Sequence, residues 1–208
     1  TALYRKAQQW PELGTLLLSR ADVTSDPARA RELKCEAASI LEAQLNDTLS
    51  ARELYGQIIA ADPGHARAAE ALTRLFAEAG DYASLVKLLD MQAEALRGED
   101  RRRVLARIAE TYEDRLHDDA EATRRYLAVL ADDPGHPDAL RGLDRLYSKA
   151  GRFQDLLENL GRQIDVAATP RQKITLWERS AGIHDEEFLD HAKAAFAREQ
   201  ILELDPAH

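Results

Sequence analysis

The chain has 208 residues, of which 45% are hydrophobic and 31% are charged, and its formal net charge is −9. With only ten glycines and seven prolines, this composition is typical of an ordered helical protein rather than a disordered one. The negative charge argues against nucleic-acid binding, which depends on clustered Lys and Arg.

The cysteine count and the hydropathy pattern bear on where the chain acts. Cys35 is the single cysteine, so an internal disulfide is excluded, which suits a reducing compartment. No run approaches the roughly 18 apolar residues of a membrane span, and the first ten residues lack the features of a secretory signal. We therefore expect a cytoplasmic protein that does not insert into membranes.

Amphipathic segments follow one another along the whole chain, with apolar residues at i, i+3, i+4 and i+7, the spacing of one helix face. Ser25 and Asp26 before Pro27, and Thr169 before Pro170, are helix-start signals. Taken in chain order, the predicted helices span residues 2–8, 11–23, 28–44, 47–61, 65–79, 83–97, 100–116, 119–132, 137–150, 154–167, 171–186 and 190–204.

An internal repeat organises these helices. Asp-Pro pairs end at Pro63, Pro134 and Pro206, so the prolines lie 71 and 72 residues apart. Each such interval contains four amphipathic segments, which predicts two helix-turn-helix repeats of roughly 36 residues each. The only methionine is Met91, and both ends of the sequence fall inside a repeat; we therefore expect a segment excised from a longer protein.

The repeat pattern resembles that of the tetratricopeptide repeat (TPR) family, whose helices carry small, large and aromatic residues at set positions. In residues 99–134 the matching residues are Leu105, Ile108, Ala109, Tyr112, Ala122, Tyr126, Leu130 and Pro134. In residues 28–63 they are Ala37, Ala38, Leu41, Ala51, Tyr55, Ile59 and Pro63. In residues 170–206 they are Trp177, Ala181, Ala194, Leu202 and Pro206, while His184 and Arg198 replace the aromatics.

The resemblance implies an all-α fold, a right-handed α–α superhelix of about six helix-turn-helix repeats. We expect residues 1–208 to form a single solenoid in which each repeat buries its apolar face on its neighbours. The expected repeats are 1–27, with a truncated first helix, followed by 28–63, 64–98, 99–134, 135–169 and 170–208.

No motif in the sequence calls for catalysis, a cofactor or a metal. His65, His136 and His208 recur after the Asp-Pro pairs, but one repeat separates each from the next, which is too far for shared coordination. The sequence has no Gly-rich phosphate loop, no nucleophile elbow and no second cysteine. We therefore expect a protein that is not an enzyme and that binds neither cofactor nor metal.

Charge on the first helix of each repeat is the feature that bears on binding, because these helices line the concave face in the family that the chain resembles. Basic residues dominate this helix in one repeat type, and acidic residues dominate it in the other. The charges either pair between neighbouring repeats or select a partner segment of alternating charge. The candidate partner-binding residues are Arg67, Arg74, Glu110, Glu113, Arg141, Arg145, Lys149 and Glu178.

The resemblance therefore implies a protein–protein interaction scaffold that binds a protein or peptide on its concave face. Two alternatives remain open. One is a structural spacer or self-assembly segment that associates end to end, and the other is a regulatory arm of an enzyme whose catalytic domain lies outside this segment.

Overall fold

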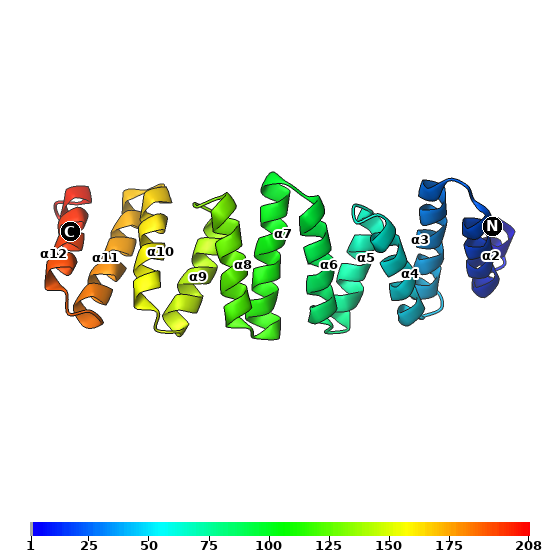
Figure 1. Ribbon diagram of the computed structural model, residues 1–208, viewed down its shortest axis with the longest axis horizontal. Helices are drawn as coiled ribbons and strands as arrows, with labels where there is room; N and C mark the ends of the chain where they lie inside the picture. The colour runs from blue at the N-terminus through cyan, green and yellow to red at the C-terminus, as the bar shows by residue number, and fades with distance from the viewer. Residues whose placement is uncertain (1) are drawn as a thin grey trace. The chain divides into compact units, whose positions relative to one another are not determined.

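The computed structural model describes residues 2–208, and its regular elements are all helices (Figure 1). The described chain divides into two compact units, with the boundary between Arg97 and Gly98. This confirms the all-α fold class that the sequence predicts.

The first unit is built from helices α1 to α6. Their bounds are α1 (Ala2–Lys6), α2 (Trp10–Val23), α3 (Pro27–Ala43), α4 (Thr48–Ala61), α5 (Ala66–Glu78) and α6 (Tyr82–Ala95).

The second unit repeats the plan with helices α7 to α12. Their bounds are α7 (Gly98–Thr111), the π-helical turn η1 (Tyr112–Leu116), α8 (Asp119–Asp132), α9 (Pro137–Lys149), α10 (Phe153–Val166), α11 (Pro170–Glu186) and α12 (His191–Leu204). Helix ends throughout both units lie within two residues of the predicted positions, if η1 is counted as the end of α7.

Capping side chains explain where most helices begin. Asp26 accepts a hydrogen bond from the backbone N–H of Ala28, and Thr169 forms a capping box with Gln172. The expected start at Asp100 was displaced, because α7 begins at Gly98 and Asp100 lies in its first turn. Acidic residues are favourable there, since they face the positive end of the helix dipole.

The recurring Asp-Pro pairs are turns that end one repeat and begin the next. The carboxylate of Asp62 accepts a hydrogen bond from the backbone N–H of Gly64 at 3.2 Å, and Asp133 does the same for Gly135 at 3.2 Å. The next helix starts immediately afterwards, so the turn fixes how the two repeats join. The 71-residue spacing of these pairs in the sequence therefore marks a repeated backbone geometry.

Each unit has its core along the line of contact between helices that follow one another in the chain. Ala38, Ala109 and Ala181 are buried where helices cross, and their small size lets the helix axes approach to about 8–10 Å. Tyr126 is fully buried between α8 and its neighbours. Within each unit, a repeat thus completes its core with the adjacent repeat.

Among the described residues, no helix combines the length and the apolar character needed to cross a membrane.

Candidate functional site: the charged first-helix face

First helices of neighbouring repeats lie next to each other in the first unit, where ion pairs join α3 to α5. The Arg67 guanidinium lies 3.3 Å from the Glu32 carboxylate. Farther along the same two helices, Arg74 on α5 forms an ion pair with Glu42 on α3. The basic helix and the acidic helix therefore pair across the repeats, and together they form one charged face.

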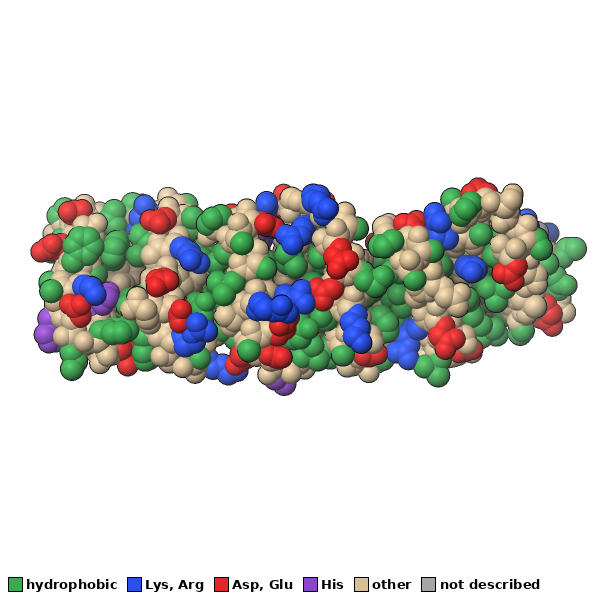
Figure 2. Space-filling view, in the orientation of Figure 1, with side chains coloured by type: hydrophobic (Ala, Val, Ile, Leu, Met, Phe, Trp, Pro, Cys, Tyr) green, Lys and Arg blue, Asp and Glu red, His purple; other side chains and the backbone are tan. Residues whose placement is uncertain are grey.

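The second unit has the same kind of face, formed by α7 with η1, α9 and α11. Arg145 on α9 donates two hydrogen bonds of 2.8 Å to the carboxylate of Glu113 on η1. Arg179 on α11 donates two of 2.7 Å to Asp144 on α9. Figure 2 shows basic and acidic side chains lying beside one another on the side of the molecule in view, not in separate patches. We call these surfaces the charged first-helix faces.

Buried tyrosines hydrogen-bond to the acids of two of these ion pairs. The Tyr126 hydroxyl donates to the Glu113 carboxylate at 2.9 Å, and the Tyr55 hydroxyl donates to Glu42 at 3.4 Å. Burial, with the neighbouring Glu42 charge as the next contribution, raises the pKa of Tyr55 to about 12. The hydrogen bond to Glu113 raises the pKa of Arg145 above its ordinary value. Each arginine thus remains charged and each tyrosine remains neutral at physiological pH.

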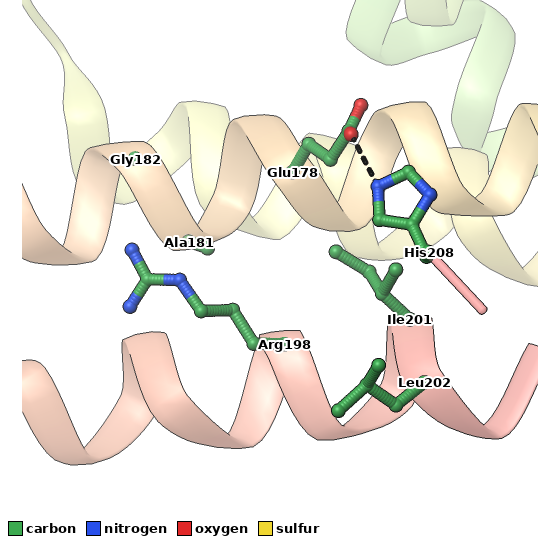
Figure 3. A pocket seen from close by; sticks show the side chains of 7 residues that line it. All are labelled: Glu178, Ala181, Gly182, Arg198, Ile201, Leu202 and His208. Atoms are coloured by element: carbon green, nitrogen blue, oxygen red, sulfur yellow. Dashed lines mark hydrogen bonds and ion pairs between the residues drawn. The ribbon is translucent and has the colours of Figure 1, made fainter. Parts of the chain in front are cut away.

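Three of the candidate binding residues have partners that the alternating-charge pattern did not indicate. Lys149 pairs with Asp119 at the start of α8, with 2.6 Å between Nζ and the carboxylate. Arg141 pairs with Asp138 within its own helix at 2.5 Å. Glu178 accepts a hydrogen bond from Nε2 of the His208 imidazole at 3.0 Å (Figure 3).

Glu110 differs from the other candidates because it has an unfavourable electrostatic environment. Desolvation is the main reason that its pKa is raised, and the charges of Asp138 and Asp114 raise it further, although Arg145 lowers it. No hydrogen bond or ion pair reaches its carboxylate from the described residues. A cation supplied by a ligand would therefore relieve a charge that the fold itself leaves unbalanced.

A groove with a volume of about 680 Å³ runs between α7 and α9 beside Glu110. Arg102 lines it, with a buried Nε that lies 3.7 Å from the Asp133 carboxylate and has no hydrogen-bond partner among the described residues. Arg107 also lines the groove, and none of the described side chains pairs with it. The lining residues are Glu99, Arg102, Arg103, Ala106, Arg107, Glu110, Asp133, His136, Pro137 and Asp138.

Comparison with solved structures identifies the fold. The C-terminal part of a TPR repeat-containing protein from Cytophaga hutchinsonii matches with a TM-score of 0.51 and 16% identity, over 99% of this chain and 81% of that one. The chain has the tetratricopeptide repeat fold.

Two further TPR structures show weaker similarity. A tetratricopeptide repeat protein from Parabacteroides merdae has a TM-score of 0.46 and 13% identity, over 96% of this chain and 75% of that one. YrrB, a TPR protein with an unusual peptide-binding site, has a TM-score of 0.48 and 11% identity, over 85% of this chain and 87% of that one. No protein-family model matches the sequence, and no curated protein matches it.

Within this tetratricopeptide repeat fold, two of the recurring histidines cap the N-termini of helices. His65 and His136 are N-caps of α5 and α9, where Nδ1 accepts hydrogen bonds from the backbone N–H groups of Ala68 and Ala139. They cap through an imidazole nitrogen, and α9 begins at Pro137, where the sequence predicts its start. Among residues 2–208, no group of three His, Cys, Asp or Glu side chains is placed to hold a metal ion.

The tetratricopeptide repeat fold distributes the eight candidate residues over both units instead of one pocket. Arg67 and Arg74 lie in the first unit, the other six lie in the second, and only Glu110 lines the α7–α9 groove. The Arg179–Asp144 pair was not predicted from the sequence, because its polarity is reversed, with the acid on the mainly basic helix. Its 35-residue separation, shared with Arg67 and Glu32, was the available signal.

Proposed function

We propose that the chain is a non-catalytic interaction scaffold that binds a protein or peptide segment on its charged first-helix face, with the α7–α9 groove as the principal site. The observation that carries this proposal is the groove itself, because two of the charged side chains that line it are unpaired within the described chain. Glu110 and Arg107 lack ion-pair partners among the described residues. By contrast, Arg145 and Glu113 satisfy each other.

The groove favours a partner segment with charges of both signs. A carboxylate of the partner would meet Arg107, and a Lys or Arg side chain would meet Glu110. Such complementarity supplies specificity and a faster association rate more than raw affinity. The sequence suggested a partner segment of alternating charge. We propose a short partner segment that carries one acidic and one basic side chain.

The other candidate residues would contribute less, because a ligand must compete with the ion pairs that they already make. Arg67, Arg74, Arg145 and Lys149 each have an acidic partner in a neighbouring helix. The exposed pairs among them, Arg67–Glu32 and Lys149–Asp119, each contribute at most about 1 kcal/mol. We propose that they extend the binding surface and that the groove determines which partner binds.

The test is affinity capture from the source cell's lysate with three baits: the unmodified chain, an Arg107→Glu/Glu110→Arg charge exchange, and a control exchange. The control is Glu158→Arg/Arg162→Glu on the exposed side of α10, which does not line the groove. Both exchanges preserve the net charge. We expect mass spectrometry to identify a partner that the unmodified and control baits recover at low salt and the groove variant does not.

Moderate salt should weaken recovery, because the proposed contacts are exposed charges. A partner that the groove variant and the control recover equally would refute the groove as the binding site. Charge reversal at Arg141 and Arg145 then tests the remainder of the face. If that variant also captures the same partner in low salt, the charged first-helix face is not the binding surface.

A further inference from the structure

A second pocket, with a volume of about 400 Å³, lies between the N-terminal halves of α9 and α11. Leu140 on α9, Val166 at the end of α10 and Leu176 on α11 are among the residues that line it. We call it the α9–α11 pocket. Both flanking helices belong to the second unit, α9 before the pocket and α11 after it, so its opening does not depend on either end of the chain.

The lining of the α9–α11 pocket is mainly apolar, in contrast to the charged α7–α9 groove. Val166 is 52% exposed there, and Ala167 and Ala168 extend the apolar surface into the turn before α11. Of the lining residues that the structure describes, only Arg141 is charged, and it already pairs with Asp138. The pocket therefore favours an apolar side chain, whose burial removes apolar surface from water.

The groove and the pocket lie on the two sides of the turn that begins α9. Pro137 lines both of them, and the ion pair between Asp138 and Arg141 joins a residue of the groove to a residue of the pocket. A Cβ added to Gly135 would lie 2.9 Å from Cγ1 of Val166, so the turn rests on the wall of the pocket. A segment that leaves the groove across the first turn of α9 would reach the pocket next.

The charges in the groove indicate which end of the partner segment lies toward the pocket. The negative charge of Asp138 on α9 contributes to the raised pKa of Glu110, after desolvation, so Glu110 lies near the α9 side of the groove. A basic side chain at Glu110 would therefore lie close to the pocket. The groove and the pocket flank one helix, a separation of about 8–10 Å, and an extended chain covers that distance in about three residues.

We infer that the segment bound in the α7–α9 groove continues over the first turn of α9 and places an apolar side chain in the α9–α11 pocket, about three residues from its basic side chain. This inference rests on the proposed function of the groove. It adds an apolar residue, at a defined distance from the basic one, to the acid and the base that the groove recognises.

Selection from a library of random linear peptides displayed on phage tests the inference, because the enriched sequences report the preferred residues directly. The targets are the unmodified 208-residue protein, the Arg107→Glu/Glu110→Arg charge exchange, and the two pocket variants Thr175→Lys and Thr175→Asp. Thr175 lines the pocket and is exposed, so both changes place a charge there without removing a core side chain. Glu158→Arg/Arg162→Glu is again the control, and circular dichroism verifies that each variant is folded.

We expect the unmodified protein and the control to enrich peptides with an apolar residue about three positions from a basic one. In a synthetic peptide of the enriched sequence, Ser at the apolar position should weaken binding about tenfold, as partial burial of one apolar side chain allows. Fluorescence polarisation measures this ratio. Both Thr175 variants should lose it, and agreement between Lys and Asp would show that apolar burial, rather than charge, is what the pocket supplies.

The possible failures of the two proposals differ. Enriched peptides that carry charges but no apolar preference would overturn the continuation into the pocket and leave the groove as the binding site. The same result follows if Ser weakens binding to the Thr175 variants as much as to the unmodified protein, or if Lys and Asp have opposite effects. Enrichment of the same peptides by the charge exchange would instead refute the groove, and with it this inference, as would a selection that enriches no peptide.

Discussion

Tyr126 combines two roles in the second unit, since its ring is buried beneath α9 and its hydroxyl holds Glu113. We predict that Tyr126→Ala lowers the free energy of unfolding by about 3–5 kcal/mol, the range for removal of a buried aromatic. Tyr126→Phe is the control, and it should cost only about 1 kcal/mol, because it removes one hydrogen bond and keeps the ring. Chemical denaturation measures both. A midpoint for Tyr126→Ala equal to that of the unmodified chain would disprove the packing role.

Glu110 gives a prediction about pH. Its pKa in the folded protein is raised, mainly by desolvation and then by nearby acids, above an ordinary value of 4.5. The folded state therefore favours the protonated form, and the stability linked to that form is present below pH 4.5 and is lost as the pH rises through the folded pKa.

Consequently Glu110→Gln should raise the unfolding midpoint relative to the unmodified chain near pH 7, and the gain should shrink toward about pH 4. Denaturation at both pH values measures it, with Glu158→Gln on α10 as a control outside the groove. If our functional proposal holds, the same variant binds its partner less well. A variant that is less stable at neutral pH would contradict the electrostatic account of Glu110.

Individual residues show how far sequence reasoning reached. The repeat spacing located Tyr55, Tyr126 and Arg198 in register, because each position recurs with the helix period. The spacing did not predict that Asp185 contacts both Arg198 and His191, nor that Lys149 forms an ion pair with Asp119. A long side chain can reach several nearby charges. The charge with which it pairs depends on backbone positions that a repeat pattern does not specify.

At the scale of the helix, α9 has a steric reason for glycine at position 142. An added Cβ would meet the Tyr126 ring at 2.3 Å, so Gly142→Ala forces α9 away from α8. We predict a loss of about 1–3 kcal/mol, typical of overpacking. Gly161→Ala on α10 is the matched control, because nothing lies within 4 Å of its added Cβ. It should gain up to about 1 kcal/mol from helix propensity.

Thermal or denaturant unfolding of the two glycine variants decides between these effects. If Gly142→Ala stabilises the protein as much as Gly161→Ala, the close approach of α9 to Tyr126 is not a constraint. A Gly142→Ala/Tyr126→Leu double variant should recover part of the loss, since the smaller side chain leaves room for the methyl group.

Whole elements were more predictable than their terminal geometry. Amphipathic periodicity predicted the helices. In the structure, Gly80 and Gly151 follow the ends of α5 and α9 with positive φ angles of 67° and 64°. The turn η1 was not predicted as π-helical. His117 follows it with a φ of 53°, a left-handed conformation that few residues other than glycine adopt. The backbone N–H groups of His117 and Asp118 donate hydrogen bonds to the Tyr112 carbonyl and stabilise this ending. A hydropathy pattern does not predict such bonds.

At the scale of the molecule, the division between Arg97 and Gly98 separates two units that each have a buried core. Leu143 and Leu160 are fully buried in the second unit, as is Tyr126. One solenoid over residues 1–208 stays a prediction of the sequence, since similarity between repeats says nothing about how strongly each pair of neighbours interacts. In a repeat protein, stability is the sum of such neighbour terms.

We predict that residues 98–208, produced separately, unfold in one cooperative transition, because the unit contains the whole α7–α9 groove and the core beneath it. Circular dichroism during thermal unfolding measures the transition. The same fragment should recover the partner that the full chain captures, and residues 1–97 should not. Partner recovery by residues 1–97 alone would move the binding site to the face around Arg67 and Arg74. A folded 98–208 fragment that recovers nothing would show that the groove requires the first unit to bind.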